Sequence, residues 1–261
     1  MKSYRVLIYC ICFLSILSVT TSHAASLTGI LSIDPGLRAD GVYAGGSYFA
    51  MGANNPNGNV AMLVPTSAPN PGGIVLGTYQ NFVLDPDVPH PDNWDGKGGK
   101  PGTGYSGTPT APANIVKPFS FFGTATYVGT NPISYQSANS HSAPTADVNM
   151  GSCVGNTCSL SVELSSWEVM WNGSAFEQGP RPSNTGPFVL AAGTYDLATH
   201  AYALGWASQI KGGPFNGVIG YWHLEGTVVP VPAAIWLLAS GLLGLFGLAR
   251  KNGWASVTSR R

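Results

Sequence analysis

Four carboxylates within a short stretch form a concentration of potential metal ligands. They are Asp85, Asp87, Asp92 and Asp95. Carboxylate oxygens are ligands that calcium prefers, and the order Asn93, any residue, Asp95, Gly96 matches part of a calcium-binding loop. Pro91 stands where the preceding ligand should be, and the bidentate glutamate of such loops is missing. We therefore expect an acidic, solvated loop and no cofactor, with calcium binding as the alternative.

Two aromatic residues in the same region could bind sugars. Trp94 and Tyr105 belong to the stretch 85–114, which is too irregular for a strand and long for a connection in a compact domain. Rings exposed on such a loop could stack on the apolar faces of sugars. The alternative is that both rings fold back into a local core.

Glycoside hydrolysis needs two carboxylates at a suitable separation. Four glutamates in the body could supply them: Glu163, Glu168, Glu177 and Glu225. No established hydrolase, zinc-protease or phosphate-loop motif accompanies them. We expect His223 and Glu225 to be solvated or to bond each other, and Arg181, between two prolines, to be a loop residue. We therefore expect no enzyme, with a polysaccharide hydrolase as the alternative.

Cys153 and Cys158 flank a Val-Gly-Asn-Thr sequence that is typical of a tight hairpin. With Gly155 and Asn156 as the two turn residues, the cysteines face each other at a closely spaced pair of strand positions. A disulfide can form there. The alternative is a metal site, but one cysteine pair without a second is a poor zinc signature.

The body of the chain has the pattern of an all-β protein. Turn residues recur every few positions, and no segment before the C-terminal tail keeps an apolar period of 3.6. We predict an antiparallel β-sandwich, with an open β-barrel as the alternative. The predicted strands are 27–33, 48–51, 60–64, 74–84, 119–128, 159–163, 167–171, 188–197, 200–206 and 218–229.

Three of these regions carry specific predictions. In 218–229, Trp222, Leu224 and Val228 should face the core, because side chains alternate between the two faces of a strand. The apolar positions of 159–163 and 167–171 have opposite parity. A bulge near Ser165 and Ser166 would reconcile them.

Residues 1–24 form a predicted secretory signal peptide. Lys2 and Arg5 precede an apolar run, and small residues before Ala25 suit a cleavage site. Cys10 and Cys12 would leave with this signal. The predicted extracytoplasmic domain then spans residues 25–228.

Residues 229–261 have the features of a membrane segment joined to the domain by an extended, proline-bearing motif. Residues 233–249 carry no charge, and at 1.5 Å per helical residue they span about 25 Å, the short end of what crosses a bilayer. The basic tail 250–261 places the C-terminus in the cytoplasm and the domain outside. The motif consists of Val229, Pro230, Val231 and Pro232.

The order of this motif, an apolar helix and a basic stop resembles the PEP-CTERM sorting signal of Gram-negative bacteria, in its Val-Pro-x-Pro-Ala variant. The resemblance implies that a membrane-embedded exosortase cuts the tail and delivers the protein to the cell surface or the extracellular space. It also implies a role in an exopolysaccharide matrix. Four strings in the body resemble uncharacterised proteins of the same class: 46–51, 118–123, 167–173 and 223–228.

Charge separates the two terminal segments from the body. Six of the twelve basic residues lie in the terminal segments and all twelve acidic residues lie between them, so the body carries a net charge of −6. Binding of nucleic acid needs a clustered basic excess, and this partner is therefore not expected. Two hypotheses result: an exported surface or matrix protein that binds exopolysaccharide, or a secreted hydrolase that acts on it.

Overall fold

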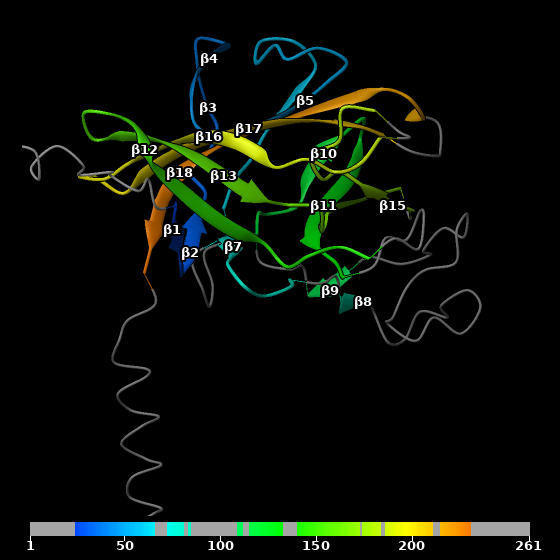
Figure 1. The fold of residues 1–261 in the computed structure, drawn as a ribbon. Helices are drawn as coiled ribbons and strands as arrows, with labels where there is room; N and C mark the ends of the chain where they lie inside the picture. The colour runs from blue at the N-terminus through cyan, green and yellow to red at the C-terminus, as the bar shows by residue number, and fades with distance from the viewer. Residues whose placement is uncertain are drawn as a thin grey trace, which may run out of the picture.

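A computed structural model describes most of the predicted domain. The described residues are 24–65, 72–80, 83–84, 109–111, 115–132, 140–172, 174–183, 186–210 and 215–230. All eighteen named elements are strands, and every pairing between named strands is antiparallel. The prediction of an all-β, antiparallel fold is confirmed. The sheets curl into a half-barrel (Figure 1).

The largest sheet has ten strands. Eight follow one another in the order β1-β12-β13-β16-β17-β18-β2-β7, while β5 pairs with β18 and β6 pairs with β5. Their bounds are β1 Ala24–Leu27, β2 Ile30–Ser32, β5 Tyr48–Met51, β6 Val60–Met62, β7 Gly73–Val75, β12 Thr145–Val154, β13 Thr157–Glu163, β16 Ala191–Asp196, β17 Ala201–Gln209 and β18 Ile219–Val229.

Three smaller sheets complete the described fold. A four-stranded sheet has the order β10-β11-β14-β15, and β3-β4 and β8-β9 form two-stranded sheets. Their bounds are β3 Leu37–Ala39, β4 Val42–Gly45, β8 Val83–Leu84, β9 Pro109–Ala111, β10 Phe119–Phe121, β11 Thr124–Thr130, β14 Trp167–Trp171 and β15 Ser174–Glu177.

The predicted alternation of β18 is confirmed. Trp222, Leu224 and Val228 are buried, while the residues between them at 223, 225 and 227 are partly or fully exposed. β17 shows the same pattern and pairs with β18 over nine residues. Both strands therefore have one face on the core and one toward solvent.

Three predicted strands are each divided in two. Segment 27–33 gives β1 and β2, which are separated at Gly29 (φ +122°) and pair with β12 and β18. Segment 74–84 contributes to β7 and β8, which belong to different sheets. Segment 119–128 gives β10 and β11, joined by a turn at Phe122 and Gly123. Glycine marks two of these divisions because it adopts positive φ without strain.

The predicted bulge near Ser165 and Ser166 is wrong. β13 ends at Glu163 in the large sheet, and β14 begins at Trp167 in the four-stranded sheet. The chain therefore passes from one sheet to the other between them. Because the two strands belong to different sheets, the alternation of β13 need not continue into β14, where four successive residues are buried.

The core lies between the large sheet and the four-stranded sheet. Trp167 of β14 packs edge-on against Trp206 of β17 and Trp222 of β18, with ring centroids 5.5 and 5.2 Å apart. All three indoles are buried, and the latter two stack on each other. These aromatic contacts fix the two sheets relative to each other.

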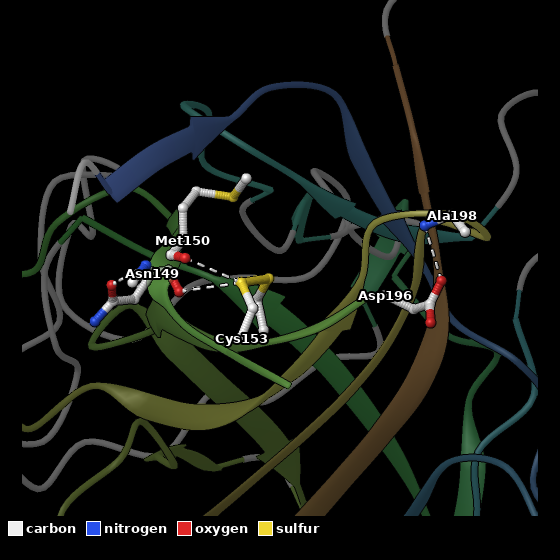
Figure 2. The surroundings of a disulfide bond; sticks show 7 residues. Asn149, Met150, Cys153, Asp196 and Ala198 are labelled. Atoms are coloured by element: carbon white, nitrogen blue, oxygen red, sulfur yellow. Dashed lines mark hydrogen bonds between the residues drawn. A yellow bond between two sulfur atoms is a disulfide. The ribbon is translucent and has the colours of Figure 1, made fainter. Parts of the chain in front are cut away.

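The predicted disulfide hairpin is confirmed. Cys153 and Cys158 form a disulfide at directly paired positions of β12 and β13, with Cα atoms 3.9 Å apart. Figure 2 shows the bond beside the carbonyl oxygens of Asn149 and Met150, and the latter oxygen lies 3.2 Å from Sγ of Cys153. Because a disulfide sulfur carries no proton, this contact is not a hydrogen bond.

The predicted signal peptide and membrane segment lie outside the described residues, apart from Ala24. Within the described ranges, no helix has the length and apolar character needed to cross a bilayer. Val229, the first residue of the predicted sorting motif, is the last residue of β18 and pairs with Ile30. The motif therefore begins inside the sheet.

Candidate functional site

The turn between β10 and β11 holds an aromatic side chain in an unusual conformation. Phe122 has φ +49° and Gly123 has φ +75°, as a tight turn with two left-handed residues requires. Asn, Asp or Gly usually fills the first of these positions, because a bulky side chain is strained there. The Phe122 side chain is nevertheless 58% exposed. Strain and exposure at one apolar residue are a reason to ask what the ring binds.

Phe122 belongs to a group of four rings, which we call the aromatic cluster: Phe121, Phe122, Trp171 and Phe215. The Phe122 ring stacks on Phe215 at 5.5 Å and 19°, and it lies edge-on to Phe121 at 4.6 Å. Phe215 in turn contacts Trp171 at 5.0 Å. Hence the cluster joins three separate parts of the chain around the exposed ring.

The indole of Trp171 is held in place by the neighbouring hairpin. Its Nε1–H donates to the carbonyl oxygen of Phe121 at 2.9 Å. Trp171 also pairs with Thr126 across β14 and β11. These links set the orientation of the ring before any ligand binds, and pre-ordered groups lose less conformational entropy on binding.

A small apolar cavity of about 30 Å³ opens beside this cluster. Its walls come from both sheets and include Phe49, Val169, Phe176 and Ile210. Gln178 forms a polar part of the wall, but its side-chain oxygen already accepts from Trp222 Nε1 at 3.3 Å. Phe121, Trp171 and Phe215 line this cavity, whereas Phe122 does not, and its volume is too small for a sugar ring, so the exposed face of the cluster is the part that a ligand could contact.

The opposite face of the four-stranded sheet carries buried charge. Glu168 of β14 and Glu177 of β15 lie directly opposite each other, and both are fully buried. The adjacent pair is hydrogen-bonded, from Gln178 N–H to Trp167 O at 2.9 Å. Glu168 and Glu177 are therefore a non-hydrogen-bonded pair, the type whose side chains lie closest together.

Arg181 neutralises Glu177 from within the protein. Its Nη1 donates to Oε2 of Glu177 in a short ion pair, and its Nη2 donates to the carbonyl oxygen of Gln209 at 3.1 Å. The guanidinium also lies over the ring of Phe188 at 5.2 Å. Arg181 thus lies in the connection between β15 and β16, as predicted for a loop residue, but it is also a buried ion-pair partner.

His141 completes this group, which we call the buried ionic cluster: His141, Glu168, Glu177 and Arg181. The His141 side chain is fully buried, its Nε2 lies 3.9 Å from Oε1 of Glu177, and its ring packs edge-on against Phe188. Neither ring nitrogen has a hydrogen-bond partner among the described residues. Burial lowers the pKa of His141 below its usual value, although the Glu177 charge acts in the opposite direction.

His223 and Glu225 occupy the solvent face of β18, and the predicted hydrogen bond between them is present. His223 Nε2 and Glu225 Oε1 are 2.8 Å apart, and Glu225 Oε2 accepts from Gly46 N–H at 3.0 Å. The His223 ring stacks on Tyr48 at 5.1 Å. Burial, with the charge of Glu225, raises the pKa of Tyr43 to about 12. The polar groups of this face therefore bind one another.

An open depression of about 320 Å³ lies next to that face, with Asp34, Asp196 and Glu225 in its wall. Asp196 Oδ1 accepts from the backbone N–H groups of Ala198 and Thr199 at 2.9 and 2.8 Å, and the bonds to Thr199 are the main cause of the lowered pKa of Asp196. Asp196 and Glu225 thus stabilise the fold itself. In the described part of the chain, no group of three or more metal-ligating side chains is placed to hold an ion.

Most of the predicted site residues cannot be compared with this geometry. The calcium candidates Asp85, Asp87, Asp92 and Asp95, the ring candidates Trp94 and Tyr105, and the motif residues Val231 and Pro232 lie outside the described residues. Of the four candidate glutamates, Glu168 and Glu177 come together but are buried. Glu163 Oε1 accepts from Ser165 N–H at 2.8 Å, and Glu225 bonds His223.

Sequence reasoning missed the aromatic cluster. The string Phe119-Ser-Phe-Phe-Gly lies within a single predicted strand, although Phe-Phe-Gly breaks the alternation and places glycine at a turn. That break is the signal that could have located the hairpin. The contribution of Phe215 depends on the fold and has no local signal in the sequence.

Comparisons with known proteins found no matching family model, no similar curated protein and no similar solved structure.

Proposed function

We propose that this chain is an exported cell-surface or matrix protein, cut by an exosortase at its C-terminal motif, whose β domain binds exopolysaccharide without catalysing its hydrolysis. The precursor is held in the inner membrane by residues 233–249 until the cut is made near Val229–Pro232. The domain is a half-barrel of antiparallel sheets that presents the aromatic cluster as its binding site.

The observation that carries this proposal is the exposed ring of Phe122, held on a backbone of positive φ. Sugar rings have apolar C–H faces that stack on aromatic side chains, and exposed apolar groups that are rigidly supported are typical of binding sites. Phe215 stacks on the Phe122 ring, and Phe121 meets it edge-on. The strain at Phe122 has a functional reason if the ring must project from the turn.

The place where the sheet ends supports the sorting part of the proposal. β18 ends at Val229, and Pro230 is exposed. Proline has no backbone N–H with which to extend the strand. A protease at the membrane would therefore meet Pro230 directly after the last paired residue.

The hydrolase alternative has less support. Glycosidase carboxylates must contact a sugar and a water molecule. Glu168 and Glu177 lie close enough to be considered, but neither has exposed surface. In the open depression, Asp196 and Glu225 are bound to groups of the fold.

A binding measurement on two variants tests the proposal. Phe122→Asn removes the ring and places at the turn a residue that favours its conformation, so the fold should be retained. We expect the exported protein to bind the producer's own exopolysaccharide about tenfold more weakly, equivalent to about 1.4 kcal/mol. Val154→Ser is the matched control, because it removes an apolar side chain that is 87% exposed at a different hairpin. Equal binding by Phe122→Asn and the parent, or no binding by the parent, would refute this function.

A further inference from the structure

His141 lies where a charge would be poorly solvated. Its side chain is fully buried, and neither ring nitrogen has a hydrogen-bond partner among the described residues. The neutral ring can remain there because it packs against Phe188. A protonated ring would lose its hydration in this buried group, and this cost outweighs the attraction of Glu177.

The charged groups that face His141 come from several elements. Glu177 lies at the end of β15 and Glu163 at the end of β13, and both favour a protonated ring. Arg181 opposes protonation, and burial opposes it most strongly. Glu168 of β14 lies opposite Glu177. The hydroxyl of Tyr79 donates to the backbone oxygen of His141 at 2.8 Å and leaves the ring nitrogens untouched.

The last residue of β15 and the residues after it connect this cluster to the aromatic site. Glu177 belongs to the buried ionic cluster, whereas Gln178, the next residue, lines the apolar cavity. The Gln178 carbonyl oxygen accepts from Trp206 Nε1 at 2.8 Å. Further along, Arg181 makes two backbone hydrogen bonds with β17, at Ala207 and Gln209. A movement of this segment would therefore alter the cavity wall.

We propose that His141 and the Glu177–Arg181 pair form an acid-sensitive latch, which holds segment 177–181 in place at neutral pH and loosens both the fold and the aromatic site under mild acid. This inference rests on the proposed function for its binding consequence. Its effect on stability does not depend on any ligand.

The direction follows from the protonation of the two states. The pKa of His141 is lowered in the folded protein, so the folded state binds a proton less readily than the unfolded state does. Neutral, buried His141 therefore contributes its full stabilisation of the fold at pH above about 6.5, the pKa of histidine in the unfolded chain. This stabilisation is lost as pH falls from there toward the lower pKa of the folded state. The unfolding equilibrium constant should rise by up to about tenfold per pH unit in this window.

A pH titration of the histidine ring signals in NMR spectra of the folded full-length protein tests whether burial keeps His141 neutral. We expect the His141 ring to remain neutral at pH of about 5.5, where an unperturbed histidine is mainly protonated. Protonation of His141 at pH of about 6.5 or above would overturn the proposal.

Variants test the consequence. In His141→Gln, which cannot take up the proton, the unfolding constant should rise about tenfold less than in the parent between pH values of about 6.5 and 5.0. His223→Gln is the comparison variant, since it removes a partly exposed histidine that lies outside the buried ionic cluster. If His141→Gln fails to fold, the acid dependence of unfolding in His141→Asn and the ring titration of the parent test the proposal instead. An unchanged acid dependence in a folded His141 variant would overturn the latch.

Binding of exopolysaccharide at neutral pH and at an acid pH where the ring titration shows His141 protonated provides the separate functional measurement. We expect the parent to lose affinity at the lower pH and His141→Gln to lose less. If the parent binds no exopolysaccharide at either pH, the proposed function fails while the stability result still decides the latch. If binding is equal at both pH values although stability falls, the coupling to the aromatic site is refuted.

Discussion

Glu168 and Glu177 lie directly opposite each other on β14 and β15, and neither has any exposed surface. Two ionised carboxylates at a closely spaced strand pair would repel each other strongly. Arg181 compensates for one of these charges through its contact with Glu177. The charges of this pair therefore affect the stability of the sheet, and its buried side chains are not accessible to a substrate.

Loss of the arginine should destabilise the domain strongly. In Arg181→Met the side chain keeps much of its length, but Glu177 loses its charged partner inside the protein. We expect the free energy of unfolding to fall by about 3–5 kcal/mol, the usual effect of breaking a buried pair on one side. Urea unfolding followed by tryptophan fluorescence measures this change.

Two further variants provide controls for that experiment. Arg38→Met removes an exposed arginine whose guanidinium donates to the backbone oxygens of Gly41 and Pro56, and it should change stability by less than about 1 kcal/mol. Glu177→Gln combined with Arg181→Met should be more stable than Arg181→Met alone. Equal stability of Arg181→Met and the parent would show that the buried pair has no such role.

Two glycines of the central strands should respond differently to the same substitution. A Cβ at Gly193 of β16 would lie 1.9 Å from the carbonyl oxygen of Ala203, whereas a Cβ at Gly205 of β17 would lie 3.5 Å from the carbonyl oxygen of Trp222. We expect Gly193→Ala to lower the free energy of unfolding by about 3 kcal/mol or more. Gly205→Ala should be nearly neutral. Thermal unfolding of both variants, followed by circular dichroism, checks the difference, which similar melting temperatures would contradict.

The disulfide should stabilise the domain only modestly. Its cysteines are separated by 5 positions in the sequence, and the entropy of closing so short a loop corresponds to about 2 kcal/mol. In the double variant Cys153→Ser, Cys158→Ser, β13 remains paired with β16 on its other side, so the domain should fold. Alkylation of the unreduced exported protein should modify neither cysteine, and mass spectrometry measures this. Free thiols in the exported protein, or an unfolded double variant, would contradict the expectation.

The parts of the fold that follow from local pattern were predictable from the sequence. Trp222, Leu224 and Val228 alternate with more polar residues and so predict β18, while Gly155-Asn156 defines the turn and the register of the disulfide hairpin. Changes of sheet were not predictable in this way. The passage from β13 to β14 looks in sequence like a bulge, since either event interrupts the alternation of side chains along the chain.

The candidate site was harder to predict, for a different physical reason. Phe122 and Phe215 are far apart in the sequence, and their stacking depends on the packing of the two sheets. The same is true of His141 and Glu177. In the sequence, Glu168 and Glu177 are candidates for a catalytic pair, but the fold buries both.

The final prediction concerns the C-terminal motif. Replacing Pro230-Val231-Pro232-Ala233 with a run of Leu and Ala should preserve membrane insertion, because the apolar length is kept, and should block processing, because the extended proline segment is lost. Val229 is left unchanged so that its pairing with Ile30 is retained. We expect the variant to stay cell-associated at full length, which immunoblotting of cell and medium fractions measures.

A second change in the C-terminal segment separates loss of the motif from a general disturbance of the tail. Trp254→Leu alters an apolar residue of the basic tail and leaves the proline motif intact, so this matched variant should be processed like the parent. In the parent, mass spectrometry of the exported product should find a C-terminus after Val229, since the residues before it are held in the sheet. If the motif variant is trimmed normally, or the parent in its own host is never trimmed, the segment is an ordinary membrane anchor and the sorting proposal is wrong.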